Sequence, residues 1–291
     1  GFPNYISKEG TRYYSELIDA LLEKGIEPVV TLYHWELPQR LQDLGGWTNP
    51  LVSDWFANYA RIVFSLYGDR VKTWITINEP LVKCDLAYQT GILAPGIISP
   101  EVGSLLCSKH VLVAHAKAWR VYDEEFRAKY HGLLILYYYS YYLYFSCKAP
   151  AEGGWPPAVE KVIAAYSKKL GYPRSNLPSL SKEETELLKV GSYAKRRKKH
   201  PEGFRKQLTW IKKEYGDVLL AIKEDGVNVT AFTAWSLMDS FEWMHGYTIK
   251  FGLYEVDFRS PDRTRTPRAS AFYYSSVIKS NSLNVPEDIG T

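Results

Sequence analysis

The sequence has little net charge and no long hydrophobic run. The formal charge is +4 over 291 residues, which is too small for strong electrostatic binding to nucleic acid or to a membrane surface. No stretch approaches the roughly 20 consecutive apolar residues that a membrane-spanning helix needs. One basic run, at residues 195–199, lacks the interleaved aromatic side chains of a nucleic-acid site, which favours a solvated face. We therefore expect a soluble protein with no nucleic-acid partner and no membrane partner.

Cysteine is also scarce. The three cysteines, Cys84, Cys107 and Cys147, show neither paired spacing nor a histidine companion at the spacing of a metal site. We interpret them as buried thiols, with one disulfide left open, and we expect no metal and no organic cofactor. The chain starts at Gly1 without the basic and apolar segments of a secretory leader. Our expectation is a mature or partial protein that is secreted, although the residues themselves leave the compartment open.

Aromatic residues, in contrast, are abundant. They make up 15% of the chain, with 9 Trp and 23 Tyr, which is more than core packing usually requires. Such a composition suits a site that stacks the flat apolar faces of sugar rings. A core and surface rich in tyrosine is the alternative for most of them.

The first half of the chain alternates helical and strand patterns. Apolar residues recur at helical spacing over residues 14–22 and again over 51–64. Each stretch is followed by a short β-rich run, at 28–34 and at 73–78. Alternation of this kind predicts a parallel sheet covered by helices, in which polar residues gather at the carboxyl ends of the strands.

Similar patterns continue along the rest of the chain. They predict a long helix over 104–130, one or two strands within 133–145, helices over 202–215 and 218–225, and a strand over 229–235. Two histidines fall in the long helix, and we assign both to helix packing rather than to catalysis. These are His110 and His115.

The predicted strand at 73–78 ends in a chemically informative way. Its last residue is Asn78, followed by Glu79 and by Pro80, which bars continuation of the strand. An amide and a carboxylic acid would thus stand at the carboxyl end of a parallel strand, where barrel enzymes carry their active sites. Glu79 is the candidate proton donor, and Asn78 is suited to hold a hydroxyl close to the reacting carbon.

Four segments, in order, resemble glycoside hydrolase family 1, the family of retaining β-glucosidases and their relatives. The sequence between them resembles insect members, at 84–88 and 154–157. The segments are Tyr-His-Trp-Glu-Leu-Pro at 33–38 with Gly-Gly-Trp at 45–47, Thr-Ile-Asn-Glu-Pro at 76–80, Trp-Ser-Leu at 235–237 with Phe-Glu-Trp at 241–243, and Arg-Thr-Pro at 265–267 with Ser-Ala-Phe-Tyr-Tyr at 270–274.

The resemblance implies a site and a fold. It implies Glu79 as the acid/base catalyst and Trp235 as the stacking wall beneath the sugar. The fold implied is α/β, a (β/α)8 TIM barrel that is incomplete in this sequence. The residues implied to hold the non-reducing sugar are His34, Asn78, Glu242 and Trp243.

Each of these side chains, and several aromatic neighbours, has a structural alternative. His34 at a strand end can be a structural histidine, and Trp47 and Trp155 are as easily core or loop residues as walls of a sugar site. We interpret Glu36 and Asp239 as turn or supporting groups and leave them out of the predicted site.

The sequence departs from the family pattern at its second carboxylate. A retaining glycosidase needs two carboxylates, one acid/base and one nucleophile, and the family's Thr-Glu-Asn-Gly nucleophile motif is absent. We predict one domain over 1–291 with strands missing before residue 1, near 190–200 and between 217 and 218. A barrel cannot close without them.

The function that follows is a retaining β-glucosidase with its nucleophile outside this sequence. Its partner is a small-molecule or oligosaccharide β-glucoside, and a homodimer is left open. Three alternatives remain: a non-catalytic sugar-binding relative that lacks the nucleophile, an inactive fragment or structural protein that inherits the sequence, and an enzyme resembling the thioglucosidases (myrosinases).

Overall fold

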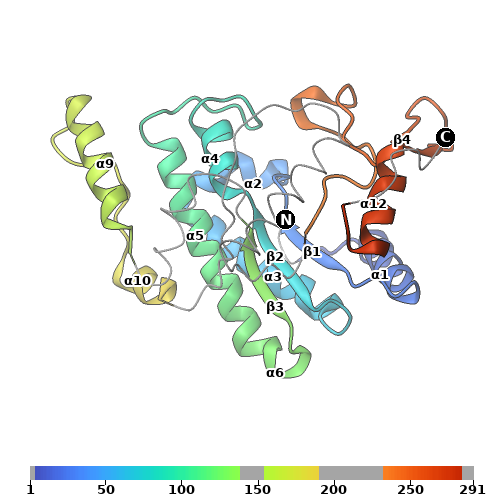
Figure 1. The fold of residues 1–291 in the computed structure, drawn as a ribbon. Coiled ribbons are helices and arrows are strands. Elements are labelled where there is room, and N and C mark those ends of the chain that lie inside the picture. The colour runs from blue at the N-terminus through green and yellow to red at the C-terminus, as the bar shows by residue number, and fades with distance from the viewer. Residues whose placement is uncertain (1–3, 138–153, 190–231, 284–291) are drawn as a thin grey trace. The chain divides into compact units, whose positions relative to one another are not determined.

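The computed structural model describes residues 4–137, 154–189 and 232–283 (Figure 1). It divides into two compact units, residues 1–199 and 200–291, and each is described by itself. The predicted helices at 202–215 and 218–225 and the basic run at 195–199 lie outside the described residues.

At the centre of the first unit, the described residues form a parallel sheet of three strands in the order β1-β2-β3 (Figure 1). β1 (Val29–Tyr33) and β2 (Thr73–Asn78) fall where the sequence predicts strands, and β3 (Leu133–Tyr137) is the described part of the run predicted at 133–145. The register pairs Val29 with Thr73 and Thr73 with Leu133. The three carboxyl ends therefore meet at one edge, as the alternating pattern predicts.

Helices join and accompany these strands, and their ends follow local chemistry. α1 begins after Ser7, whose side chain accepts a hydrogen bond from Gly10 N at 3.1 Å. It ends at Glu23, and Gly25, two residues later, has φ 68°, a conformation that glycine adopts without steric cost. Within the described residues of this unit the helices are α1 (Lys8–Glu23), α2 (Gln39–Asp43), the 3-10 turn η1 (Gly46–Thr48), α3 (Val52–Tyr67), α4 (Pro80–Tyr88), α5 (Gly103–Val121), the π turn η2 (Tyr122–Phe126), α6 (Arg127–Tyr130), α9 (Pro157–Lys169) and α10 (Lys182–Leu188).

The helix predicted over 104–130 is not a continuous α-helix. It begins one residue earlier, at Gly103, and passes through a π turn at Tyr122–Phe126 before α6. At this wider turn the rings of Tyr122 and Phe126 both pack on Phe64 of α3, at centroid distances of 5.0 and 5.8 Å. The apolar spacing of the sequence did not predict this π turn. The turn coincides with packing between aromatic side chains that are distant in the chain, and spacing carries no signal for such contacts.

The two histidines of α5 are packing residues, as predicted. His110 lies with Nδ1 2.8 Å from Trp47 O, and His115 lies with Nδ1 2.9 Å from the Thr76 hydroxyl of β2. Both side chains are buried. Burial lowers the pKa of His115 to about 4, so this imidazole stays neutral near neutral pH.

The buried His115 predicts a loss of stability in mild acid. Because its folded pKa is about 4 and the unfolded value is 6.5, the unfolded chain binds the extra proton between these pH values. The free energy of unfolding should fall as pH drops through this window, by about 2 to 3 kcal/mol from this group. Urea unfolding at pH 7 and pH 4.5 measures it. His115→Gln should reduce the difference, whereas His131→Gln, at an exposed site, should not.

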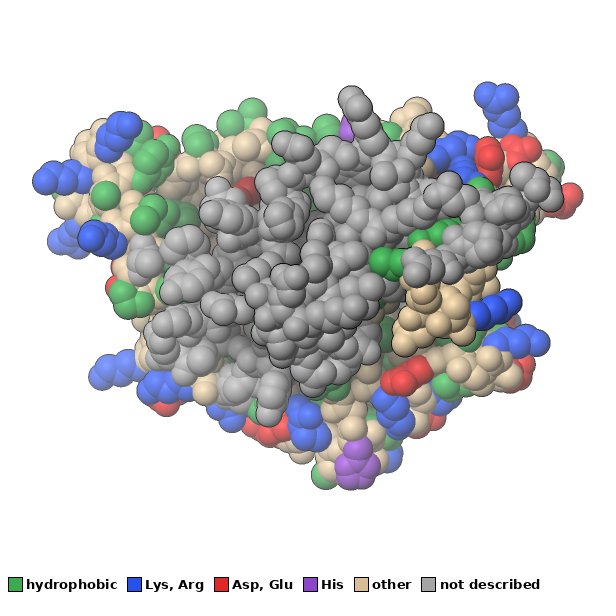
Figure 2. All heavy atoms as spheres, in the orientation of Figure 1, with side chains coloured by type: hydrophobic (Ala, Val, Ile, Leu, Met, Phe, Trp, Pro, Cys, Tyr) green, Lys and Arg blue, Asp and Glu red, His purple; other side chains and the backbone are tan. Residues whose placement is uncertain are grey.

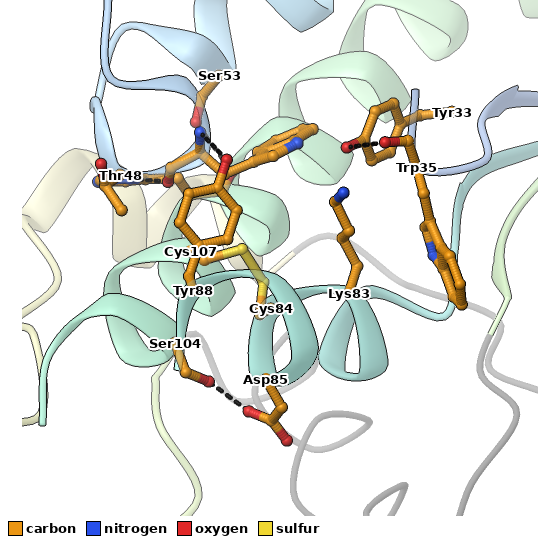
Figure 3. Close-up of a disulfide and its surroundings, with 12 residues drawn as sticks. Tyr33, Trp35, Thr48, Ser53, Lys83, Cys84, Asp85, Tyr88, Ser104 and Cys107 are labelled. Atoms are coloured by element: carbon orange, nitrogen blue, oxygen red, sulfur yellow. Dashed lines mark hydrogen bonds between the residues drawn. A yellow bond between two sulfur atoms is a disulfide. The ribbon is translucent and has the colours of Figure 1, made fainter. Parts of the chain in front are cut away.

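Two cysteines form a disulfide, the possibility that the sequence had left open. Cys84 of α4 and Cys107 of α5 are bonded, with their Cα atoms 5.5 Å apart (Figure 3). The spacing of 23 residues carries no signal of pairing in sequence, because the antiparallel approach of two helices decides it. Cys147 lies outside the described residues.

The second unit packs a small antiparallel pair, β4 (Tyr254–Val256) and β5 (Arg265–Pro267), beside α12 (Ala269–Ser280). Its core is formed by Leu253, Tyr273 and Val277, and a 3-10 turn, η3 (Trp243–His245), follows Glu242. The strand predicted at 229–235 is wrong in its described part, since residues 232–235 are not a strand. β-rich composition favours an extended chain, but a strand also requires a ladder, and the bridge forms later, between Met238 and Tyr254.

On the face shown in Figure 2, the described charged side chains are dispersed. Figure 2 shows lysine and arginine side chains spread around the visible face with acidic ones among them, consistent with a net charge of only +4. Within residues 4–137, 154–189 and 232–283, no helix combines the length and apolar content that crossing a membrane requires.

Candidate active site

The carboxyl edge of the three-stranded sheet brings three predicted site residues together. His34 follows β1, Asn78 ends β2, and Glu79 comes next along the chain. The Asn78 side-chain nitrogen lies 3.1 Å from His34 Nε2, so the amide can donate to the imidazole. Two strand ends 44 residues apart in sequence thus present a coupled amide and imidazole beside a carboxylic acid.

His34 is suited to accept hydrogen bonds. Burial lowers its pKa, and the nearby Glu36 carboxylate opposes this effect only in part. The imidazole is therefore neutral at neutral pH, and a neutral ring has one nitrogen that accepts and one that donates. Such a side chain can bridge the Asn78 amide and a hydroxyl of a bound ligand.

Trp35 holds the same edge together, and our sequence reasoning did not assign it a role. Its indole nitrogen donates to Asn78 O at 2.8 Å, and its own carbonyl accepts from the Tyr33 hydroxyl at 3.1 Å. The backbone at Trp35 has φ 86°, which is rare for a bulky residue. The only available signal was its place inside the Tyr-His-Trp-Glu-Leu-Pro segment.

Glu79 occupies a sharp turn between β2 and α4. Its backbone is left-handed, with φ 40° and ψ 58°, and Pro80 begins the helix directly after it. A non-glycine residue in this region costs about 1 to 3 kcal/mol and persists where the surroundings impose it, which is common at functional sites. The turn leaves the half-buried Glu79 at the sheet edge, between the strand that carries Asn78 and a helix.

The remaining predicted residues lie in one short segment of the second unit. Glu242 is buried, at 7% exposure, and accepts a hydrogen bond from the Ser240 hydroxyl at 3.2 Å. Trp243 follows it with φ 40°, and the Trp235 side chain is half exposed. A buried carboxylate next to exposed aromatic surface is the chemistry that a pyranose requires, with acceptors for hydroxyls and a flat wall for the ring face.

Asp239 anchors this segment, in line with its interpretation as a supporting group. Its carboxylate pairs with Arg268 at 2.8 Å and accepts from the backbone nitrogens of Gly252 and Val256 at 2.9 and 3.2 Å. Burial opposes ionisation of Asp239, but Arg268 and these donors outweigh it and lower the pKa. The ion pair and the two backbone hydrogen bonds of Asp239 therefore hold the segment 235–243 against β4 and the start of α12.

Two tryptophans that had been left open take structural roles. Trp47 is almost fully buried, at 1% exposure, and lines an apolar cavity of about 450 Å³ between β1 and α3. None of the predicted site residues lines that cavity. Trp155 is half-buried and donates its indole nitrogen to Pro178 O at 2.7 Å, which fixes a loop.

Comparison with known proteins places the chain in a family. The sequence model of glycosyl hydrolase family 1 matches residues 1–144 and 217–283. Myrosinase 1 of Brevicoryne brassicae is 33% identical, covering 96% of this chain and 80% of the relative, and the cytosolic beta-glucosidase of Cavia porcellus is 31% identical, covering 99% and 82%. The chain belongs to glycosyl hydrolase family 1, and it is a glycoside hydrolase.

Solved structures agree on the fold. The aphid myrosinase structure superposes with a TM-score of 0.80 at 31% identity, covering 96% of this chain and 80% of that one. A beta-glucosidase from Thermotoga maritima in complex with castanospermine gives 0.78 at 26% identity, covering 97% and 80%. The fold is accordingly the (β/α)8 TIM barrel of this family, and it is incomplete in this sequence.

The incompleteness includes internal segments. The alignment with the Brevicoryne brassicae enzyme runs over 374 residues, whereas this chain has 291. The relative therefore contains stretches inside the matched span that have no counterpart here. The family match is also interrupted over residues 145–216.

Proposed function

We propose that this glycosidase is a retaining β-glucosidase in which Glu79 is the acid/base catalyst. The observation that carries the proposal is the grouping of His34, Asn78 and Glu79 at the carboxyl edge of a parallel sheet, with the amide and imidazole nitrogens 3.1 Å apart. Active sites of barrel enzymes lie at this edge. In the glycosylation step Glu79 gives its proton to the leaving oxygen, and in the second step it takes a proton from water.

The same proposal assigns the sugar hydroxyls and the ring face. Asn78 and His34 hold hydroxyls close to the reacting carbon, where hydrogen bonds strengthen as charge develops in the transition state. Glu242 and Trp243 take the outer hydroxyls of a terminal β-D-glucoside, and Trp235 stacks on the ring. This assignment requires residues 1–291 to act as one barrel domain, as the sequence analysis expects.

The nucleophile belongs, in this proposal, to a segment that the sequence does not contain. Double displacement needs a second carboxylate about 5 to 5.5 Å from the first. The internal stretches that the relatives have and this chain lacks support that location. Glu224 and Asp225, near the expected junction, lie outside the described residues and are not assigned this role.

The Cys84–Cys107 disulfide supports secretion. Disulfides form and persist in oxidising compartments and are rare in the cytosol. Relatives of this chain include cytosolic beta-glucosidases, so family membership alone does not decide the compartment.

A thioglucosidase is the second candidate function. It is favoured by the likeness of this chain to Myrosinase 1 of Brevicoryne brassicae and to the aphid myrosinase structure.

The stereochemistry of the first product tests the proposal. We expect the natural protein to release β-glucose first from an aryl β-glucoside, because two displacements at one carbon restore its configuration. Proton NMR of the anomeric signal during the first minutes measures this. Release of α-glucose would overturn the retaining mechanism, and absence of any product with intact glucose binding would favour the non-catalytic relative. Faster cleavage of an aryl thioglucoside would favour the second candidate.

A further inference from the structure

Glu79 lies at the start of helix α4, which is too short to be stable without contacts to other elements. It has nine residues, and helices shorter than about 12 are marginal without tertiary packing. Its first backbone bond joins Lys83 N to Glu79 O at 3.1 Å. The backbone of Glu79 is therefore continuous with α4 on one side and with β2 on the other, and the angle between these two elements sets its conformation.

Helix α5 fastens α4 by a covalent bond and by close contact. The Cys84–Cys107 disulfide joins them, and both sulfur-bearing residues are fully buried (Figure 3). The Ser104 hydroxyl donates to the Asp85 carboxylate beside it. At Gly103 the two backbones are so close that a Cβ atom would lie 2.1 Å from a carbonyl oxygen of α4.

Helix α5 is also fastened to β2, the strand on the other side of Glu79. His115 Nδ1 lies 2.9 Å from the Thr76 hydroxyl, and Thr76 precedes Asn78 by two residues. Cys107 and His115 are eight residues apart on one helix, about 12 Å along its axis. The connections thus form a closed ring: β2, Glu79, α4, the disulfide, α5, His115 and back to β2.

We propose that Cys84 and Cys107 are positioning residues for the acid/base catalyst, an inference that rests on the function proposed for Glu79. The ring fixes the angle between β2 and α4. That angle keeps the Glu79 backbone in its left-handed conformation, which the chain would not retain without this constraint. Without the disulfide, α4 can shift away from α5. A displacement of about 1 Å at a catalytic group can cost up to 10²-fold in rate.

The test uses the natural protein with both cysteines replaced, Cys84→Ala and Cys107→Ala. It compares the activity of this double variant on two substrates that differ in their leaving group. An alkyl β-glucoside needs proton donation to its leaving oxygen, whereas a 2,4-dinitrophenyl β-glucoside needs almost none. We expect kcat/KM, which reports the glycosylation step, to fall about 10-fold or more for the alkyl substrate and less than about 3-fold for the dinitrophenyl substrate. Equal losses on both substrates, or no loss on either, overturn the inference.

Controls separate positioning from stability. Val111→Ala deletes buried methyl groups one turn after Cys107 on the same helix but leaves the disulfide intact, so both substrates should respond alike. Where the double variant does not fold, Ser104→Ala removes the neighbouring contact between α5 and Asp85 and should show the same leaving-group pattern at about 2- to 5-fold, by the same positioning argument. Equal losses in this variant overturn the inference as well.

The outcome for Glu79→Gln distinguishes the two proposals. If that variant loses the alkyl substrate selectively and the double cysteine variant does not, only the positioning role is wrong. If Glu79→Gln shows no leaving-group dependence, the function proposed for Glu79 is wrong.

Discussion

Glu79→Gln is expected to lower kcat/KM for a β-glucoside with a poor leaving group by about 10² to 10⁴, the usual contribution of a positioned general acid. Glutamine keeps the size of the side chain and its hydrogen-bonding oxygen, but its amide is far too weak an acid to protonate a leaving group. Binding of a ground-state ligand such as glucose should therefore stay within about 3-fold, because the side chain is not lost from the site. The measurement is steady-state kinetics on an alkyl or weakly activated aryl β-glucoside.

The matched control for this variant is Glu27→Gln. Glu27 is exposed and precedes β1, at the opposite edge of the same sheet, so the same chemical change there should leave the kinetics unchanged. Unchanged turnover in Glu79→Gln would remove this residue from the mechanism. A loss of turnover together with a comparable loss of glucose binding would instead indicate that the site had been disrupted.

Glu242→Ala is expected to weaken glucose or gluconolactone binding by roughly 2 to 4 kcal/mol. The buried carboxylate would accept hydrogen bonds from two sugar hydroxyls, and both charge-assisted bonds are lost together. Calorimetry or inhibition kinetics measures the change. The Ser240 hydroxyl, which donates to this carboxylate at 3.2 Å, would also be left without its acceptor.

Glu255→Ala is the control in the same unit. This carboxylate is exposed and pairs with Lys250 at 3.1 Å, and surface ion pairs contribute about 0 to 1 kcal/mol. Binding of the sugar should be unaffected by its removal. If Glu242→Ala binds as tightly as Glu255→Ala, the sugar pocket has been assigned to the wrong segment.

Elements governed by neighbours in sequence were predicted well. The strand at 73–78 matches β2 at both ends, because a β-rich run closed by a proline leaves little choice. The helix at 51–64 is α3, and Phe56 and Phe64 of its predicted apolar face are buried, whereas Leu51 and Tyr59 are exposed. The helix at 14–22 is α1, extended at its start by the cap at Ser7, which periodicity does not register.

Contacts between distant residues were predicted only where a motif suggested them. The strand ends bearing His34 and Asn78 were expected to share an edge, and their side-chain nitrogens are 3.1 Å apart. The role of Trp35, whose indole crosses from one strand end to the other, was missed because an indole carries no sequence signal for its acceptor. The described part of the strand at 229–235 was wrong because composition cannot supply the partner that a ladder needs.

The sequence by itself determined the class of fold, the family, and which residue types stand at the ends of its strands. These follow from apolar spacing, caps and short motifs, all of which act over a few neighbouring residues. Only the tertiary structure decided that Cys84 pairs with Cys107, that His115 meets Thr76, and that the π turn forms beneath Phe64. Each joins groups that are remote along the chain, and only the packing of whole helices on the sheet brings them within bonding distance.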